Sequence, residues 1–210
     1  MWIDINKNNI LRKEEKEMEN KKKEKKVINA TTVPQPANFY GDSKLQADVA
    51  VRELADDTYK VIVLRPPMIY GKDSKGNYRT LAKLAKKLPI FPDVDNERSM
   101  LYIENLCEFL CKIMLLKPYH RNSVVLLPQN GEWTKTSDMV KEIAKASGKK
   151  IVELKCLAPA VKIGSKMTCK IGGLVNKAFG NECYMFAVSN YNGIKYQNIS
   201  MKQSVMEMNS

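Results

Sequence analysis

Hydrophobic positions along the chain alternate between two spacings. Apolar residues three or four positions apart predict helices, and short runs rich in β-branched residues predict strands. The predicted elements are a helix at 43–54, a strand at 59–65, a helix at 78–87, a strand at 99–103, a helix at 104–116, a strand at 123–127, a helix at 136–147, a strand at 151–154 and a helix at 159–179. This order is typical of an α/β protein, and its nearly continuous apolar strands favour a parallel sheet buried on both faces.

The first 26 residues do not follow this pattern. They are dominated by Lys, Glu and Asn and offer almost nothing apolar to bury, so burial cannot offset the entropy cost of ordering them. We therefore predict a charged, disordered leader or solvated helix at 1–26 and one α/β domain at 27–210. A nucleic-acid-binding arm is the alternative for these lysines, but the interleaved glutamates cancel much of their field.

Composition narrows the class of protein. The formal net charge is +12, which favours anionic ligands such as nucleotides and phosphorylated sugars. No nucleic-acid-binding motif accompanies the charge, so nucleic acid is not the expected partner. The five cysteines contain no CxxC pair and His120 is the single histidine, so we expect reduced thiols, a cytoplasmic protein and no metal site. No apolar run approaches the roughly 18 residues of a membrane span.

Tyr40 and Lys44 form a YxxxK motif that could carry acid/base chemistry. Residues four apart share one helical face, and a neighbouring ammonium stabilises the phenolate that would take a proton from a sugar hydroxyl. The same lysine could reach the ribose hydroxyls of a nicotinamide cofactor. The alternative is a surface tyrosine beside a solvated lysine, and Tyr191 and Lys195 show the same spacing without the same context.

The context of Tyr40 is a proline-rich connector before it, then the 43–54 helix, the 59–65 strand and the sequence RPPMIYG at 65–71. Over roughly residues 28–205 this order resembles the extended short-chain dehydrogenases/reductases of the nucleotide-sugar epimerase/dehydratase type. The resemblance implies the carboxy-terminal portion of a Rossmann-like parallel sheet with a smaller substrate-binding lobe. It also implies an NAD or NADP cofactor, a nucleotide-sugar substrate and oxidoreductase or isomerase chemistry.

The resemblance also implies roles for individual residues. Tyr40 matches the acid/base, and Lys44 matches the residue that tunes it and holds the nicotinamide ribose. Pro66 and Pro67 match the turn that lies against the nicotinamide, where prolines give a rigid wall without donors. Arg98 matches an arginine that holds the substrate diphosphate; its alternative is a surface arginine paired with a neighbouring carboxylate.

Two parts of the family pattern are missing from these 210 residues. None of the ten glycines forms a G-x-x-G-x-x-G turn for the pyrophosphate, and no serine or threonine lies two dozen residues before Tyr40. We therefore expect a truncated chain that is incomplete or inactive in isolation, with a homo-oligomer or another partner supplying the missing half. The alternative is a non-catalytic binding or regulatory remnant of the same fold.

Overall fold

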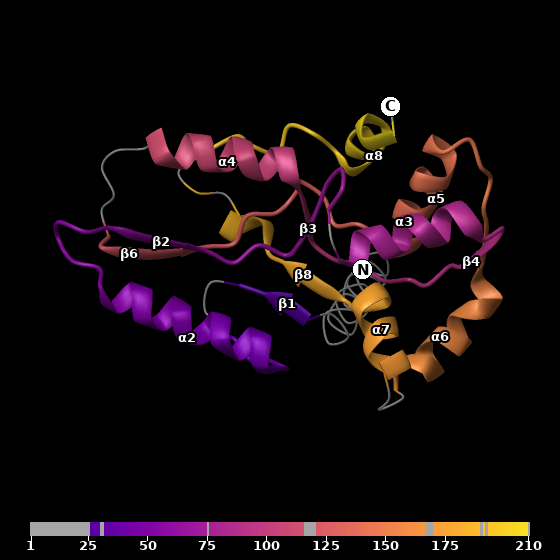
Figure 1. Ribbon diagram of the computed structural model, residues 1–210, viewed down its shortest axis with the longest axis horizontal. Coiled ribbons are helices and arrows are strands. Elements are labelled where there is room, and N and C mark those ends of the chain that lie inside the picture. The colour runs from indigo at the N-terminus through magenta and orange to yellow at the C-terminus, as the bar shows by residue number, and fades with distance from the viewer. Residues whose placement is uncertain are drawn as a thin grey trace, which may run out of the picture.

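The computed structural model describes residues 26–29, 32–74, 76–115, 121–166, 170–189, 191 and 193–209. Figure 1 shows its elements. The helices are α2 (Phe39–Glu53), α3 (Asn77–Lys87), α4 (Ile103–Leu115), α5 (Thr136–Ala146), α6 (Ala158–Ser165), α7 (Lys170–Phe179) and α8 (Met201–Asn209). The strands are β1 (Lys26–Ile28), β2 (Val61–Leu64), β3 (Met68–Tyr70), β4 (Ile90–Pro92), β5 (Met100–Tyr102), β6 (Ser123–Leu126), β7 (Val152–Leu154) and β8 (Glu182–Tyr184). The predictions for the leader up to residue 25 and for His120 fall outside the described residues.

The described strands pair two by two, and all four pairs are parallel: β1 with β8, β2 with β6, β3 with β5 and β4 with β7. In the longest pair Val61 lies opposite Ser123 and Leu64 opposite Leu126. Parallel partners need a crossover, and helices of the intervening chain supply it. In Figure 1, α2 lies on one side of the β2–β6 pair and α4 on the other. The predicted α/β class with parallel strands is confirmed.

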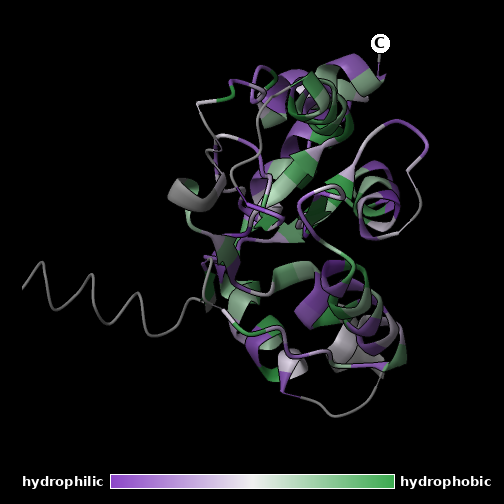
Figure 2. Cartoon of the chain, turned by 90° about the vertical axis from the view of Figure 1, so that its left-hand side faces the viewer, coloured by the Kyte–Doolittle hydropathy of each residue, from purple (hydrophilic) through white to green (hydrophobic). Residues whose placement is uncertain are grey.

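Two groups of buried side chains hold the helices and the strand pairs together. The larger one joins α3, α5 and α8 to β3 and β5, with Met100, Met139 and Ile143 fully buried. The smaller one joins α4 to β6 and contains the ring pair Phe109 and Tyr196, whose centroids are 4.6 Å apart. Hydrophobic residues gather accordingly on the strands and on the helix faces turned toward them (Figure 2). Burial of these faces is the main stabilising term of the fold.

A chain of buried hydrogen bonds fastens β3 to α8. Asn130 Nδ2 donates to the Tyr70 hydroxyl at 3.1 Å, and the Tyr70 and Ser204 hydroxyls are 2.9 Å apart. Ser204 Oγ donates to the carbonyl oxygen of Met201 at 2.7 Å. Because the single hydroxyl proton of Ser204 is used there, Tyr70 is the donor to Ser204.

The helix predicted at 159–179 is wrong as one element. The chain forms two helices there, because α6 ends at Ser165 and α7 begins at Lys170. They pack against each other, and Asn176 Nδ2 donates to the carbonyl oxygen of Ser165 at 3.0 Å. A Cβ at Gly164 would lie 3.5 Å from Val175, which is an ordinary contact distance, so this packing does not require glycine. Glycine is a poor helix former, so Gly164 weakens a single continuous helix across this stretch.

Candidate active site

Tyr40 and Lys44 lie in the first turns of α2. Asn38 is the N-cap of this helix, and its side-chain oxygen accepts a hydrogen bond of 2.9 Å from the backbone N–H of Gly41. The helix therefore begins before the predicted residue 43, because the cap fixes its start. Lys44 follows Tyr40 by four residues, and its ammonium lies 5.6 Å from the centroid of the tyrosine ring. The predicted shared face is confirmed.

A cavity of about 650 Å³ opens between α2 and β2. Tyr40, Lys44 and Pro66 all line it, together with the side of β2 from Ile62 to Leu64. Pro67, one residue further on, is half-buried and is not among the lining residues. The structure thus brings together three of the five residues singled out from the sequence, although α2 and the proline turn are separated along the chain.

An ion-pair cluster holds α2 against the turn that carries Pro66. Asp48 accepts hydrogen bonds from Arg65 Nε at 2.7 Å and from Arg52 Nε at 2.5 Å. Partial burial alone would raise the pKa of Asp48, but the two arginines outweigh it and lower the pKa below its ordinary value of 3.8. Asp48 lies one helical turn beyond Lys44, so the cluster fixes how α2 presents the cavity face.

Arg98 lies elsewhere, buried and 8% exposed. Its Nη1 donates to the backbone carbonyl oxygens of Lys177 and Ala178 in the last turn of α7. Carbonyl groups in the last turn of a helix have no partner within the helix, so the guanidinium serves as a cap there. Burial lowers the pKa of Arg98, with attraction to Glu182 acting the other way. Contact of Arg98 with a diphosphate stays a prediction.

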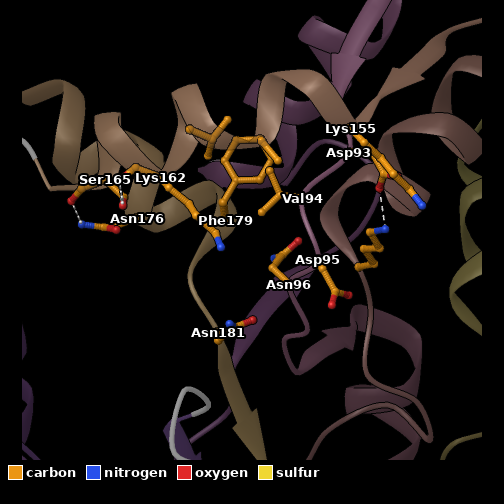
Figure 3. Close-up of a pocket in the computed structure, with 13 residues that line it drawn as sticks. Asp93, Val94, Asp95, Asn96, Lys155, Lys162, Ser165, Asn176, Phe179 and Asn181 are labelled. Atoms are coloured by element: carbon orange, nitrogen blue, oxygen red, sulfur yellow. Dashed lines mark hydrogen bonds and ion pairs between the residues drawn. The ribbon is translucent and has the colours of Figure 1, made fainter. Parts of the chain in front are cut away.

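A second cavity of about 650 Å³ lies beside this cap (Figure 3). Its wall includes the Phe179 ring and the side chain of Val94, while Asp95, Asn96, Lys162 and Asn181 place polar groups around the same space. At one end Lys135 forms an ion pair with Asp93, and this pair lowers the pKa of Asp93. The lining residues come from separate stretches of chain between 93 and 181, so no motif spacing in the sequence could have found this cavity.

The remaining candidates show no comparable geometry. Tyr191 and Lys195, the second YxxxK pair, lie in an irregular segment and not on a helix. Among the described residues, no three His, Cys, Asp or Glu side chains gather as a metal ion would require. Within the same part of the chain, every helix is too short or too polar to cross a bilayer.

The sequence is similar to that of known proteins. Residues 17–123 match the family model described as "NAD dependent epimerase/dehydratase family". A UDP-glucose 4-epimerase of Vibrio cholerae is 33% identical over 118 residues, which cover 54% of this chain and 35% of that protein. An N-acetyl-alpha-D-glucosaminyl-diphospho-ditrans,octacis-undecaprenol 4-epimerase of Escherichia coli O157:H7 is 35% identical over 80 residues, covering 36% of this chain and 24% of that protein.

Solved structures show the same fold. UDP-glucuronic acid 4-epimerase from Bacillus cereus, in complex with NAD, superposes with a TM-score of 0.62 at 15% identity, over 87% of this chain and 54% of that one. UDP-N-acetylglucosamine 4-epimerase from Bacillus cereus gives a TM-score of 0.57 at 16% identity, over 87% and 56%. The predicted Rossmann-like fold is therefore confirmed. The chain spans about a third of the length of the first curated relative and about half of these solved structures.

Proposed function

The chain belongs to the NAD dependent epimerase/dehydratase family, and we propose that it carries the acid/base half of a nucleotide-sugar oxidoreductase site. One observation carries the proposal: Tyr40, Lys44 and Pro66 line a single cavity, with the Lys44 ammonium 5.6 Å from the Tyr40 ring. Tyr40 is 70% exposed, so its phenol is open to a substrate hydroxyl. A positioned phenol of this kind is a general acid or base for a sugar hydroxyl.

In the proposed reaction Tyr40 takes the proton of a sugar hydroxyl at its phenolic oxygen. The neighbouring Lys44 ammonium stabilises the negative phenolate before that transfer, because opposite charges a few ångströms apart attract. Asp48 with Arg65 holds α2 in place, and Pro66 gives the cavity a rigid wall. When bound, NAD or NADP would supply the hydride acceptor. The proposal covers NAD and NADP alike.

The residues fit one end of such a cofactor. Lys44 and Tyr40 offer donors for ribose hydroxyls, and Pro66 offers a flat apolar surface for a ring. For the pyrophosphate, no glycine-rich turn from strand to helix occurs among the described residues. We infer that a polypeptide other than these residues completes the cofactor site. Among the described strands β2 pairs with β6 alone, so its other edge can accept a further strand.

The second cavity supports a nucleotide-bearing substrate. Phe179 provides an aromatic face on which a base can stack. Asp95 and Asn181 provide an acceptor and a donor for ribose hydroxyls and base edges, and Lys162 provides a cation for phosphate. To bind a diphosphate, the Arg98 guanidinium would have to leave the backbone carbonyl groups of α7. While it stays bonded to them, Arg98 positions the wall of the cavity.

A second candidate function is a non-catalytic remnant that keeps the fold but turns nothing over. It is supported by the described residues, among which no glycine-rich turn joins a strand to a helix. The two candidates predict different behaviour of the same protein, because only the first requires Lys44 to face a ligand. For either candidate function, the cytosol is the compartment we propose, supported by Cys107, Cys111 and Cys156, which are exposed thiols outside any disulfide.

Titration of NAD and NADH into the purified chain, followed by calorimetry and by thermal stability, tests the proposal. Hydrogen bonds from a charged group contribute about 1.5–3 kcal/mol, so Lys44→Ala is expected to weaken binding by about tenfold or more. Lys195→Ala, from the second YxxxK pair, is the matched control and should change nothing. Equal effects of both variants would favour the remnant. Absence of binding by a folded sample would mean that the chain is a remnant or needs its partner.

A further inference from the structure

A third cavity, of about 420 Å³, lies beside α3, and we call it the α3 cavity. Its wall combines the turn at 71–74 after β3 with one face of α3 and the end of α8. Positions 79, 82 and 86 of α3 all line it, because residues three or four apart share a helical face. It has no lining residue in common with the Tyr40 cavity or with the cavity beside Arg98, so it is a separate space.

Three cationic side chains surround the α3 cavity. Lys72, Arg79 and Lys86 line it, and all three are exposed. Within the described part of the chain, none of them forms an ion pair. Asp73 is the single carboxylate among the described lining residues, so positive charge is in excess around the cavity. Such a wall attracts anions.

Two hydroxyl groups in the same wall have no hydrogen-bond partner among the described residues. Ser74 Oγ is buried and unpaired, and a change of rotamer would be needed for it to reach a ligand. Tyr78 is 8% exposed, and its hydroxyl is unpaired but open to the cavity, whereas the neighbouring Tyr70 hydroxyl has two partners. Burial raises the pKa of Tyr78 to about 12, so this hydroxyl keeps its proton at neutral pH. Because buried polar groups are normally hydrogen-bonded, the unpaired hydroxyls indicate a ligand with acceptor atoms.

The turn that carries Lys72 and Ser74 is fixed by its own contacts. The backbone N–H of Ser74 donates to the carbonyl oxygen of Gly71 at 3.2 Å, and Asp73 has a φ of 60°, in the left-handed region. Gly71 packs closely on the start of α4, since a Cβ there would lie 2.5 Å from Ile103 Cγ2. A preorganised wall of this kind loses little conformational freedom when a ligand binds.

The length of the cavity indicates a ligand larger than an inorganic anion. Arg79 and Lys86 are seven residues apart, which is about 10 Å along a helix. A phosphate at Arg79 therefore leaves room toward Lys86 for an organic group. Asn209 Nδ2 donates to the carbonyl oxygen of Val205 at 2.8 Å, which leaves its Oδ1 as an acceptor, and Asp73 provides a second one. Acceptors of this kind fit the hydroxyl groups of a sugar.

We propose that the α3 cavity binds a sugar phosphate, with the phosphate beside Arg79. The guanidinium presents a planar fork of N–H donors that matches two phosphate oxygens, and the Tyr78 hydroxyl donates to a third. Lys72 adds positive charge from the turn. The sugar lies toward Lys86 and Asn209. This site does not depend on the proposed catalytic function, because it uses none of the residues around Tyr40.

Calorimetric titration of glucose 1-phosphate into the full chain, in a phosphate-free buffer, tests the site. We expect Arg79→Gln to weaken binding by about tenfold or more, because it removes a charged hydrogen-bond donor. Lys87→Gln is the matched control: Lys87 is also an exposed cation of α3 but is not among the lining residues, so screening should keep its effect below about twofold. Absence of binding by the folded wild type, or equal weakening by both variants, overturns the proposal.

Inorganic phosphate and glucose, titrated separately, test the two parts of the ligand. Glucose 1-phosphate should bind more tightly than either, because the cavity contacts both its phosphate and its sugar. Equal affinities for inorganic phosphate and glucose 1-phosphate overturn the assignment of a sugar phosphate. Lys162→Gln, which changes the cavity beside Arg98, should leave binding unchanged. A loss of binding in that variant would place the ligand in the other cavity and would equally overturn the proposal.

Tyr78→Phe distinguishes a ligand-binding hydroxyl from a structural one. Because the hydroxyl has no partner among the described residues, its removal should not lower the Tm of the ligand-free protein. It should reduce the rise in Tm that glucose 1-phosphate gives the wild type. Tyr70→Phe is the matched control, since its hydroxyl is bonded within the protein: it should lower the ligand-free Tm and keep the rise. A lower ligand-free Tm with an unchanged rise in Tyr78→Phe overturns the role of this hydroxyl.

Discussion

Replacing Tyr70 with phenylalanine tests the hydrogen-bonded link between β3 and α8. Tyr70 is fully buried, and its hydroxyl accepts from Asn130 Nδ2 and donates to Ser204 Oγ. Tyr70→Phe keeps the ring and its neighbours but removes the acceptor of Asn130 Nδ2. The amide donor would then be buried without that partner, while Ser204 would still donate to Met201.

The expected cost follows from this loss. A buried donor left unsatisfied costs about 1–3 kcal/mol. For a chain of this length each 1 kcal/mol shifts Tm by about 2–4 °C. A central value of about 2 kcal/mol therefore predicts a fall in Tm of about 4–8 °C for Tyr70→Phe. Burial raises the pKa of Tyr70, so its hydroxyl stays protonated and the value applies across the neutral range.

Calorimetric melting of the wild type, Tyr70→Phe, Ser204→Ala and the double variant is the assay. The two single changes act on one hydrogen-bond chain, so the double variant should lose less stability than the sum of the singles. Tyr59→Phe is the matched control: Tyr59 is 54% exposed and its change should stay within about 0.5 kcal/mol. Equal Tm values for Tyr70→Phe and Tyr59→Phe, or full additivity with Ser204→Ala, would refute the reasoning.

Three further predictions concern other parts of the fold. Because the pKa of Asp48 is lowered, its ion pairs stabilise the protein fully above the ordinary pKa of 3.8, and this stabilisation is lost as the pH falls through the lowered pKa. Asp48→Asn should remove this pH-dependent part of the unfolding free energy, as measured by denaturant titrations in acid. Arg98→Met should loosen the end of α7, so trypsin should cleave after Lys177 faster than in wild type or in the exposed control Arg79→Met. Ile143→Ala, at a fully buried position of α5, should cost about 2–5 kcal/mol in unfolding free energy.

The sequence by itself determined the class of fold and the part of the candidate site that contains Tyr40 and Lys44. Hydrophobic spacing located the helices α2 to α5 and the strands β2, β5, β6 and β7, because each is long or apolar enough to show its period. The spacing of Tyr40 and Lys44 predicted a shared helical face, and the 5.6 Å distance agrees with it. These are local properties, fixed by backbone geometry within a few residues.

The tertiary structure decided what depends on contacts between distant segments. Strands β1, β3, β4 and β8 were not predicted, although β5 and β7 are equally short, and parallel partners far along the chain define them. The chain forms α6 and α7 as two helices that pack against each other, where the sequence predicted one. Arg98 sits in a charged sequence, yet the fold buries it against the end of α7. A side chain's neighbours across the fold, which no spacing encodes, determine whether it is free for a ligand or held by the backbone.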